Sequence, residues 1–184
     1  MVVIRAASAA DAAQVAAVMR DSWQAAYDGL IESVFIDRAT WPDGGERIRQ
    51  SFWVRPWQRM LAATGSPAAG IVGYATFGPE LDVLGKSWPY PRTAAGSAGE
   101  VAELYALYVH PDWWSTGTGR ALMAKVLEAM REAGYAAITL WVLEANARAR
   151  RFYQRAGFAA DGARHNLPDL GGVTEIRYRR ALAG

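Results

Sequence analysis

The sequence predicts an α/β protein in which about seven strands and about four helices form one domain. Two observations lead to this prediction. Segments with the apolar pattern of strands alternate along the chain with segments whose apolar residues recur at helical spacing. The chain has 184 residues, of which 52% are hydrophobic and 21% charged, a composition that suits one domain with one substantial core. We therefore expect residues 1–184 to fold as a single domain.

The first half of the chain predicts a strand, two helical regions and a hairpin. "MVVIRAA" has the pattern of a strand, and Ser8 is a suitable N-cap for the helix "AADAAQVAAVMRDSWQAAY". A less regular helical region spans Ile31 to Trp53 and is interrupted near "WPDGG". "RMLAA" and "GIVGYATFG" predict two strands joined by the turn "TGSPAAG". The segment from Pro79 to Gly99, rich in proline and glycine, predicts a long surface loop.

The second half predicts a strand, a helix, a strand, a helix and a final hairpin. "EVAELYALYVHP" is rich in β-forming residues and ends at His-Pro. In "GRALMAKVLEAMREAG", Leu122, Val126 and Met130 form one apolar stripe, and Gly134 is a natural C-cap. "AAITLWVL" is almost continuously apolar, as expected of a strand covered on both faces. "NARARRFYQRAG" predicts a short helix, and "ARHNLPDLGGVTEIRYRRAL" predicts the hairpin.

The composition excludes several classes of protein and site. The chain has no cysteine, which excludes disulfides, thiolate metal sites and a cysteine nucleophile. His110 and His165 are far apart and lack metal-ligand spacing, so we expect no metal. A formal net charge of +2 gives little support for nucleic-acid binding, and no apolar run is long enough to cross a bilayer. Arg5 and Asp11 interrupt any signal-peptide pattern, so we expect a cytoplasmic protein without nucleic-acid or membrane partners.

The segment "HPDWWSTGTGRALM" joins the predicted central strand to the following helix. The first N–H groups of a helix have no intrahelical partner, and the helix dipole adds a partial positive charge there. Gly117 and Gly119 lack the Cβ atoms that would keep a ligand away from the backbone. A phosphate group suits such a place, although a tight strand-to-helix turn explains the same residues. The glycine spacing matches neither a P-loop nor a dinucleotide fingerprint.

Two motifs resemble the GNAT superfamily of N-acetyltransferases. "LYALYVHPDWWSTGTGRAL" resembles the acetyl-CoA-binding segment of that family, with Gly117 and Gly119 at its two small positions and Trp114 where Gln or Arg is usual. "NARARRFYQRAGF" resembles a later motif of the family, in which an Asn is followed by a helix that carries Phe-Tyr and ends in Gly-Phe. The resemblance spans the chain and implies a GNAT-type fold with a mixed, mostly antiparallel, twisted sheet. It also implies acetyl-CoA as co-substrate, with its pyrophosphate at the glycine turn.

The resemblance implies a set of cofactor-binding residues. Leu107 and Val109 are expected to pair through their main chain with pantetheine, as an added strand would. Asn146 suits either a hydrogen bond to pantetheine or an N-cap. The remaining expected contacts come from the loop and the start of the helix: Trp114, Ser115, Thr116, Gly117, Thr118, Gly119 and Arg120. Arginines on the later helix predict a solvated face, from which one could approach the 3′-phosphate: Arg148, Arg150, Arg151 and Arg155.

The implied reaction is acetyl transfer to an amine by direct attack in a ternary complex, since no cysteine can carry the acyl group. Tyr153 matches the family's general acid for the departing thiolate, although it also suits packing against Phe152. Glu103 is the candidate base, acting through a water relay, with Glu100 as the fallback. Glu103 is expected to share a strand face with Tyr105 and Leu107. A strand-end residue that reaches solvent is the simpler explanation of Glu103.

The acceptor site of the resembled family lies between the first helical region, the central strand and the last hairpin. Trp23, Tyr27, Tyr105 and Trp141 could form an aromatic wall there, although core packing explains them equally well. Trp113 and Trp114 could cover the CoA entrance or a dimer surface. The acceptor is a small-molecule or peptide amine of unidentified structure, and the protein is a monomer or homodimer. A CoA-binding or sensing module that has lost turnover is the alternative function.

Overall fold

The computed structural model describes residues 2–40, 46, 48, 50, 58–66, 69–80 and 101–182. The main elements follow in the order β1 (Val3–Ala6), α1 (Ala12–Tyr27), α2 (Ser33–Thr40), β2 (Arg59–Thr64), β3 (Ile71–Pro79), β4 (Val101–Val109), α4 (Thr118–Glu132), β5 (Ala137–Leu143), α5 (Ala147–Arg155), β6 (Ala159–Leu167) and β7 (Val173–Ala181). Of the helices described, none is long and apolar enough to cross a bilayer.

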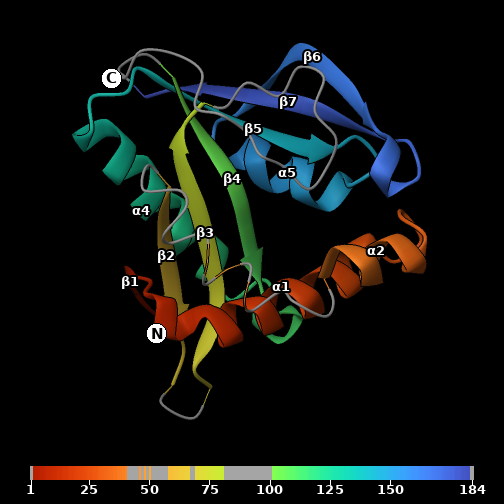
Figure 1. The fold of residues 1–184 in the computed structure, drawn as a ribbon. Helices are drawn as coiled ribbons and strands as arrows, with labels where there is room; N and C mark the ends of the chain where they lie inside the picture. The colour runs from red at the N-terminus through yellow and green to blue at the C-terminus, as the bar shows by residue number, and fades with distance from the viewer. Residues whose placement is uncertain are drawn as a thin grey trace.

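The strands form a single seven-stranded sheet in the order β1-β2-β3-β4-β5-β7-β6 (Figure 1). All neighbouring strands run antiparallel except β4 and β5, which are parallel because α4 connects them. The parallel pair is short: it joins Val101–Leu104 to Ala137–Leu140, and the two strands then diverge. The sequence prediction of an α/β fold with a mixed, mostly antiparallel sheet is therefore confirmed.

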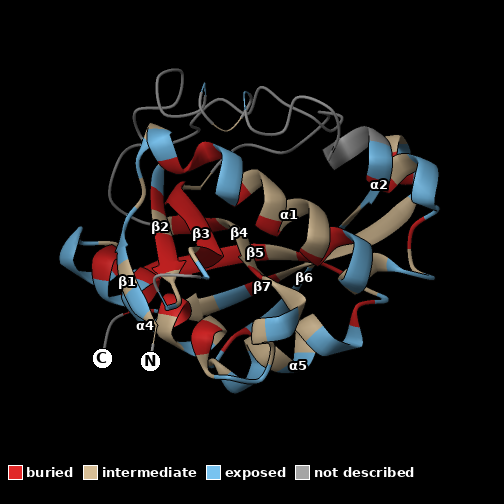
Figure 2. Ribbon diagram, turned by 90° about the horizontal axis from the view of Figure 1, so that it is seen from below, coloured by how far each residue is buried: buried red, intermediate tan, exposed pale blue. Residues whose placement is uncertain are grey.

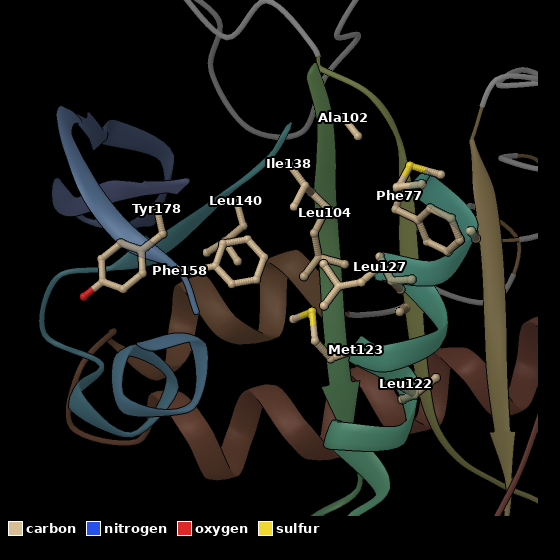
Figure 3. Packing of buried hydrophobic residues seen from close by; sticks show 14 of the residues in the cluster. Phe77, Ala102, Leu104, Leu122, Met123, Leu127, Ile138, Leu140, Phe158 and Tyr178 are labelled. Atoms are coloured by element: carbon tan, nitrogen blue, oxygen red, sulfur yellow. The ribbon is translucent and has the colours of Figure 1, made fainter. Parts of the chain in front are cut away.

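Helices cover both faces of the sheet. Figure 2 shows α1 and α2 on one face and α4 and α5 on the other, with the strands between them. The stripe predicted on α4 is buried: Leu122, Val126 and Met130 are at most 1% exposed. Figure 3 shows the side chains of α4 directed toward those of β3, β4 and β5. The face of the sheet toward α4 and α5 therefore holds the largest apolar cluster.

A bulge in β4 changes which side chains share a face. Opposite Thr76 and Phe77, β4 contains one extra residue between Leu104 and Ala106. Leu104 and Leu107 consequently pack in the same cluster, against α4 and α5. The expectation that Glu103 shares a face with Leu107 was wrong, because strict alternation does not survive a bulge.

The predicted elements agree with the structure wherever it describes them. Ser8 begins the first helical region with a capping box to Asp11, and a single 3₁₀ turn precedes α1. Gly134 has a left-handed backbone directly after α4, as a C-terminal glycine should. The predicted loop from Pro79 to Gly99 and the interruption near "WPDGG" fall almost wholly outside the described residues, as does Glu100.

Candidate active site

Beyond Leu104, β4 no longer pairs with β5, and the region between the two diverging strands is called the opening below. The His110 N–H donates to the Val72 carbonyl of β3 at 2.9 Å, so Leu107 and Val109, which alternate with it, present their backbone groups to the opposite side. Figure 1 shows that this side faces the gap between β4 and β5. Leu107 and Val109 therefore lie where the sequence analysis expected an added strand of ligand to pair.

The carbonyl of Val109 is already bonded in this structure. It accepts a hydrogen bond from Ser22 Oγ of α1 at 2.9 Å and another from Trp114 Nε1 at 2.7 Å. The end of β4 is thereby joined both to α1 and to the loop that follows. An added ligand strand would consequently use the Leu107 backbone and the Val109 N–H.

The loop before α4 concentrates unpaired backbone donors. Among the described residues, none of the backbone N–H groups from Ser115 to Arg120 donates to a protein group. Ser115 and Gly117 both have positive φ, 64° and 95°, which turns successive N–H groups inward. Thr116 Oγ1 holds the loop through contacts with the Trp113 carbonyl at 2.7 Å and Thr118 Oγ1 at 2.9 Å. The loop and the start of α4 can therefore hold a phosphate group.

The two glycines of this loop serve different purposes. Gly117 is the N-cap of α4, and its φ of 95° strains any other residue. Gly119 has an ordinary backbone, and a Cβ there would meet the Phe152 ring of α5 at 3.4 Å. Both glycines were expected to let a ligand approach the backbone, and this stays a prediction. Gly119 also lies against Phe152 of α5, at an ordinary van der Waals distance for an added Cβ.

Helix α5 carries the other motif beside the same opening. The Asn146 side chain accepts a hydrogen bond from the Ala149 N–H at 3.0 Å, so Asn146 is the N-cap of α5. Tyr153 is half-buried, packs edge-on against Phe152 and Phe158, and lies on the α4 and α5 face of the sheet. Its hydroxyl has no hydrogen-bond partner among the described residues. Burial raises the pKa of Tyr153 and so favours its protonated hydroxyl still further.

The candidate base Glu103 lies on the other face of the sheet. Its neighbours Ala102 and Leu104 both point into the cluster beneath α4, so the Glu103 side chain points toward the α1 layer. It is 1% exposed and is paired in register with Thr139 of β5. Leu104 is the last residue that pairs with β5. Glu103 therefore lies beside the closed end of the opening and does not reach solvent as a strand-end residue would.

The four predicted acceptor residues each contact a neighbour in the described part of the chain. Trp23 and Tyr27 pack edge-on in α1, with ring centroids 5.0 Å apart. The Tyr105 hydroxyl donates to the Pro79 carbonyl, and Trp141 packs against His165 with ring centroids 4.3 Å apart. Helical spacing correctly predicted the contact between Trp23 and Tyr27. The aromatic wall of all four residues stays a prediction.

Sequence reasoning missed three polar residues of this face. The Tyr108 hydroxyl lies 3.4 Å from that of Tyr27, and burial raises the pKa of both. His165 Nε2 lies 3.4 Å from a carboxylate oxygen of Glu175, whose negative charge also raises the pKa of Tyr27. Tyr108 and Tyr27 come together because of the β4 bulge. His165 and Glu175 are cross-strand partners. The predicted final hairpin would have placed them side by side if its strand register had been predicted as well.

The arginines and tryptophans near the loop divide into distinct groups. Arg150 donates to the Glu144 carbonyl and the Tyr178 hydroxyl, whereas Arg151 and Arg155 are exposed as predicted. The Trp113 ring packs closely over Gly65 at the turn between β2 and β3. Trp114 lies under the guanidinium of Arg148. In the described part of the chain, no group of His, Asp and Glu side chains is arranged to hold a metal ion.

Comparison with known proteins identifies the class of enzyme. The model of the acetyltransferase (GNAT) family matches residues 17–158. The chain therefore belongs to the GNAT acetyltransferase family, and it is an acetyl-CoA-dependent N-acetyltransferase.

Individual relatives agree with this assignment. Rv2775 of Mycobacterium tuberculosis, a probable N-acetyltransferase, is 27% identical over 180 residues, which are 96% of this chain and 91% of that protein. YuaI of Bacillus subtilis, an uncharacterised N-acetyltransferase, is 25% identical over 146 residues, which are 79% of this chain and 74% of that one.

Solved structures show the same fold. PaiA N-acetyltransferase from Thermoplasma acidophilum, in complex with coenzyme A, superposes with a TM-score of 0.74 at 19% identity, over 98% of this chain and 99% of that one. YncA from Salmonella typhimurium, with acetyl-CoA, superposes with a TM-score of 0.69 at 20% identity, over 100% and 95%.

Proposed function

We propose that the protein transfers an acetyl group from acetyl-CoA to a primary amine by direct attack within a ternary complex. The proposal rests mainly on one observation: β4 stops pairing with β5 after Leu104, and Tyr153 packs in the same cluster as Leu107 of β4 and Trp114 of the donor-rich loop. Pantetheine would lie along Leu107 and Val109, with the pyrophosphate at residues Ser115–Arg120. The Asn146 amide, whose oxygen caps α5, would offer its N–H groups to the pantetheine chain.

The chemistry requires one bond to form and one to break. The neutral amine nitrogen attacks the thioester carbon, and collapse of the tetrahedral intermediate breaks the carbon–sulfur bond. Tyr153 gives its proton to the departing thiolate, the nitrogen of the intermediate releases its extra proton to water, and the tyrosine is then reprotonated from solvent. Burial keeps Tyr153 protonated, and the same apolar surroundings raise the proton affinity of the thiolate.

The acceptor amine loses its proton on the α1 and α2 face. We assign this step to Glu103 through a relayed water, because Glu103 adjoins the closed end of the opening. The aromatic pair Trp23 and Tyr27 and the carboxylate of Glu175 line this face as well. Aromatic rings and carboxylates both attract an ammonium group before it is deprotonated.

A screen of amine acceptors tests the proposal, with release of CoA thiol as the signal. The chain itself contains no cysteine, so a thiol-reactive chromophore reports CoA alone, without background from the protein. The screen should span peptide N-termini, lysine side chains, polyamines and aminoglycosides. Thiol release that depends on the amine supports the proposal. Tight CoA binding without release by any amine would instead support the alternative, a CoA-binding or sensing module.

A further inference from the structure

We propose that Arg148, whose guanidinium lies over the indole of Trp114, binds the pyrophosphate of acetyl-CoA beside the start of α4. The inference deepens the proposed function and depends on acetyl-CoA occupying the opening. It assigns purposes to two side chains that the motifs leave unexplained. The sequence had suggested the arginines of α5 only for the 3′-phosphate, and the pyrophosphate had been assigned to the loop and the start of α4.

The contact between the two residues is close. The guanidinium carbon of Arg148 lies 3.7 Å from the centroid of the Trp114 ring. Trp114 is itself fixed, since its Nε1 donates to the Val109 carbonyl at 2.7 Å and its ring packs against the main core. A planar guanidinium stacked on a fixed indole keeps its N–H groups free at the edge. Trp114 therefore positions a flexible cation before any ligand binds.

The location of Arg148 follows from the packing of α5. Phe152 follows Arg148 by four residues, so the two share one side of the helix. Phe152 lies 3.4 Å from the Cβ position of Gly119, in the first turn of α4. That side of α5 consequently faces the start of α4, and Arg148, one turn earlier, lies beside the donor-rich loop.

The charges around the loop also favour a bound anion. Among the described residues, neither Arg148 nor Arg120 forms an ion pair, whereas Arg164 pairs with Glu144 at 2.7 Å. Arg148 occupies the first turn of α5 and Arg120 the first turn of α4, and neither turn contains an acidic residue. Cations at helix N-termini oppose the helix dipole. A diphosphate between the two helices converts this unfavourable arrangement into a favourable one.

Calorimetric titration with CoA tests the assignment. Arg148→Ala should weaken CoA binding by roughly tenfold or more, the usual effect of losing a charge-assisted hydrogen bond. Arg151→Ala is the matched control, because Arg151 is exposed on the same helix. The Arg151→Ala protein should bind CoA normally. Arg148→Ala should weaken the binding of dephospho-CoA, which lacks the 3′-phosphate, by the same factor as the binding of CoA. Pantetheine, which lacks the pyrophosphate, should bind both proteins equally.

The indole contribution is tested in the same titrations. Trp114→Leu keeps an apolar side chain but removes the flat ring, whereas Trp114→Phe keeps a ring. We expect Trp114→Leu to weaken CoA binding about threefold, with Trp114→Phe closer to the unmodified protein. In the Trp114→Leu protein, the further change Arg148→Ala should then weaken CoA binding by a smaller factor than it does in the unmodified protein, because the two residues act together. Full additivity would refute the positioning by Trp114.

The remaining outcomes separate this inference from the proposed function. If the unmodified protein does not bind CoA, the proposed function fails and this inference fails with it. If the unmodified protein binds CoA and Arg148→Ala binds it equally well, only the present inference is overturned. A loss that appears with CoA but disappears with dephospho-CoA would transfer the contact to the 3′-phosphate and also overturn the pyrophosphate assignment.

Discussion

Replacement of Tyr153 by phenylalanine is the most direct test of the proposed chemistry. The change removes one oxygen atom, and that hydroxyl has no hydrogen-bond partner in the described part of the chain. The folded state therefore loses no hydrogen bond, and Tm should stay the same or rise slightly. If the hydroxyl protonates the departing thiolate, kcat should fall roughly 10²–10⁴-fold, which corresponds to about 3–5 kcal/mol in the barrier. CoA affinity should remain unchanged.

Tyr178 provides a contrasting control. Its hydroxyl accepts hydrogen bonds from Arg150 Nε at 3.3 Å and from Gln154 Nε2 at 3.2 Å, and the side chain is 1% exposed. Tyr178→Phe should therefore destabilise the fold by about 1–2 kcal/mol, lower Tm by several degrees and leave kcat per folded molecule intact. Thiol release and thermal unfolding measured on both variants distinguish the two tyrosines. Near-normal kcat for Tyr153→Phe with a true acceptor would remove Tyr153 from the mechanism and leave solvent as the proton donor.

Three further predictions follow from named contacts. Because burial raises the pKa of Tyr153, kcat should not decline from its ionisation as the pH passes the ordinary tyrosine value of 10, which a pH–rate profile measures. Gly117→Ala should cost about 1–2 kcal/mol of stability because of its φ of 95°, whereas Gly119→Ala should cost less, as thermal melts will compare. Asp11→Asn should cost about 1–3 kcal/mol, since the carboxylate accepts two hydrogen bonds from Arg5. Because Arg5 first, and then the Ser8 contacts, hold the pKa of Asp11 well below its ordinary value, the difference in denaturant stability should be complete at neutral pH and shrink progressively as the pH falls below about 4.

Much of the fold could be predicted because its signals are local. The stripe on α4, the N-cap Asn146 and the continuous apolar pattern of β5 each depend on neighbours within a few residues. The two GNAT motifs are local in the same sense. They were sufficient to bring the loop before α4 and the Tyr153 helix to one opening.

The site details that failed depend on distant parts of the chain. The β4 bulge arises from pairing with β3, and it reversed the face expected for Leu107. The stacking of Arg148 on Trp114 depends on how α5 packs beside α4, which no spacing within either segment specifies. The contact between Gly119 and Phe152 likewise joins two helices, so spacing within either helix does not specify it.

The short parallel contact between β4 and β5 has a consequence for cooperativity. Strands β1 to β4 form one half of the sheet, and strands β5 to β7 form the other half. In the described chain, the only strand pairing between the two halves joins Val101–Leu104 to Ala137–Leu140. A cofactor that is hydrogen-bonded along Leu107 and Val109 would fill part of the region where β4 and β5 diverge. The co-substrate would then act as a piece of secondary structure, and its departure after each turnover would loosen the mechanical connection between the two halves of the molecule.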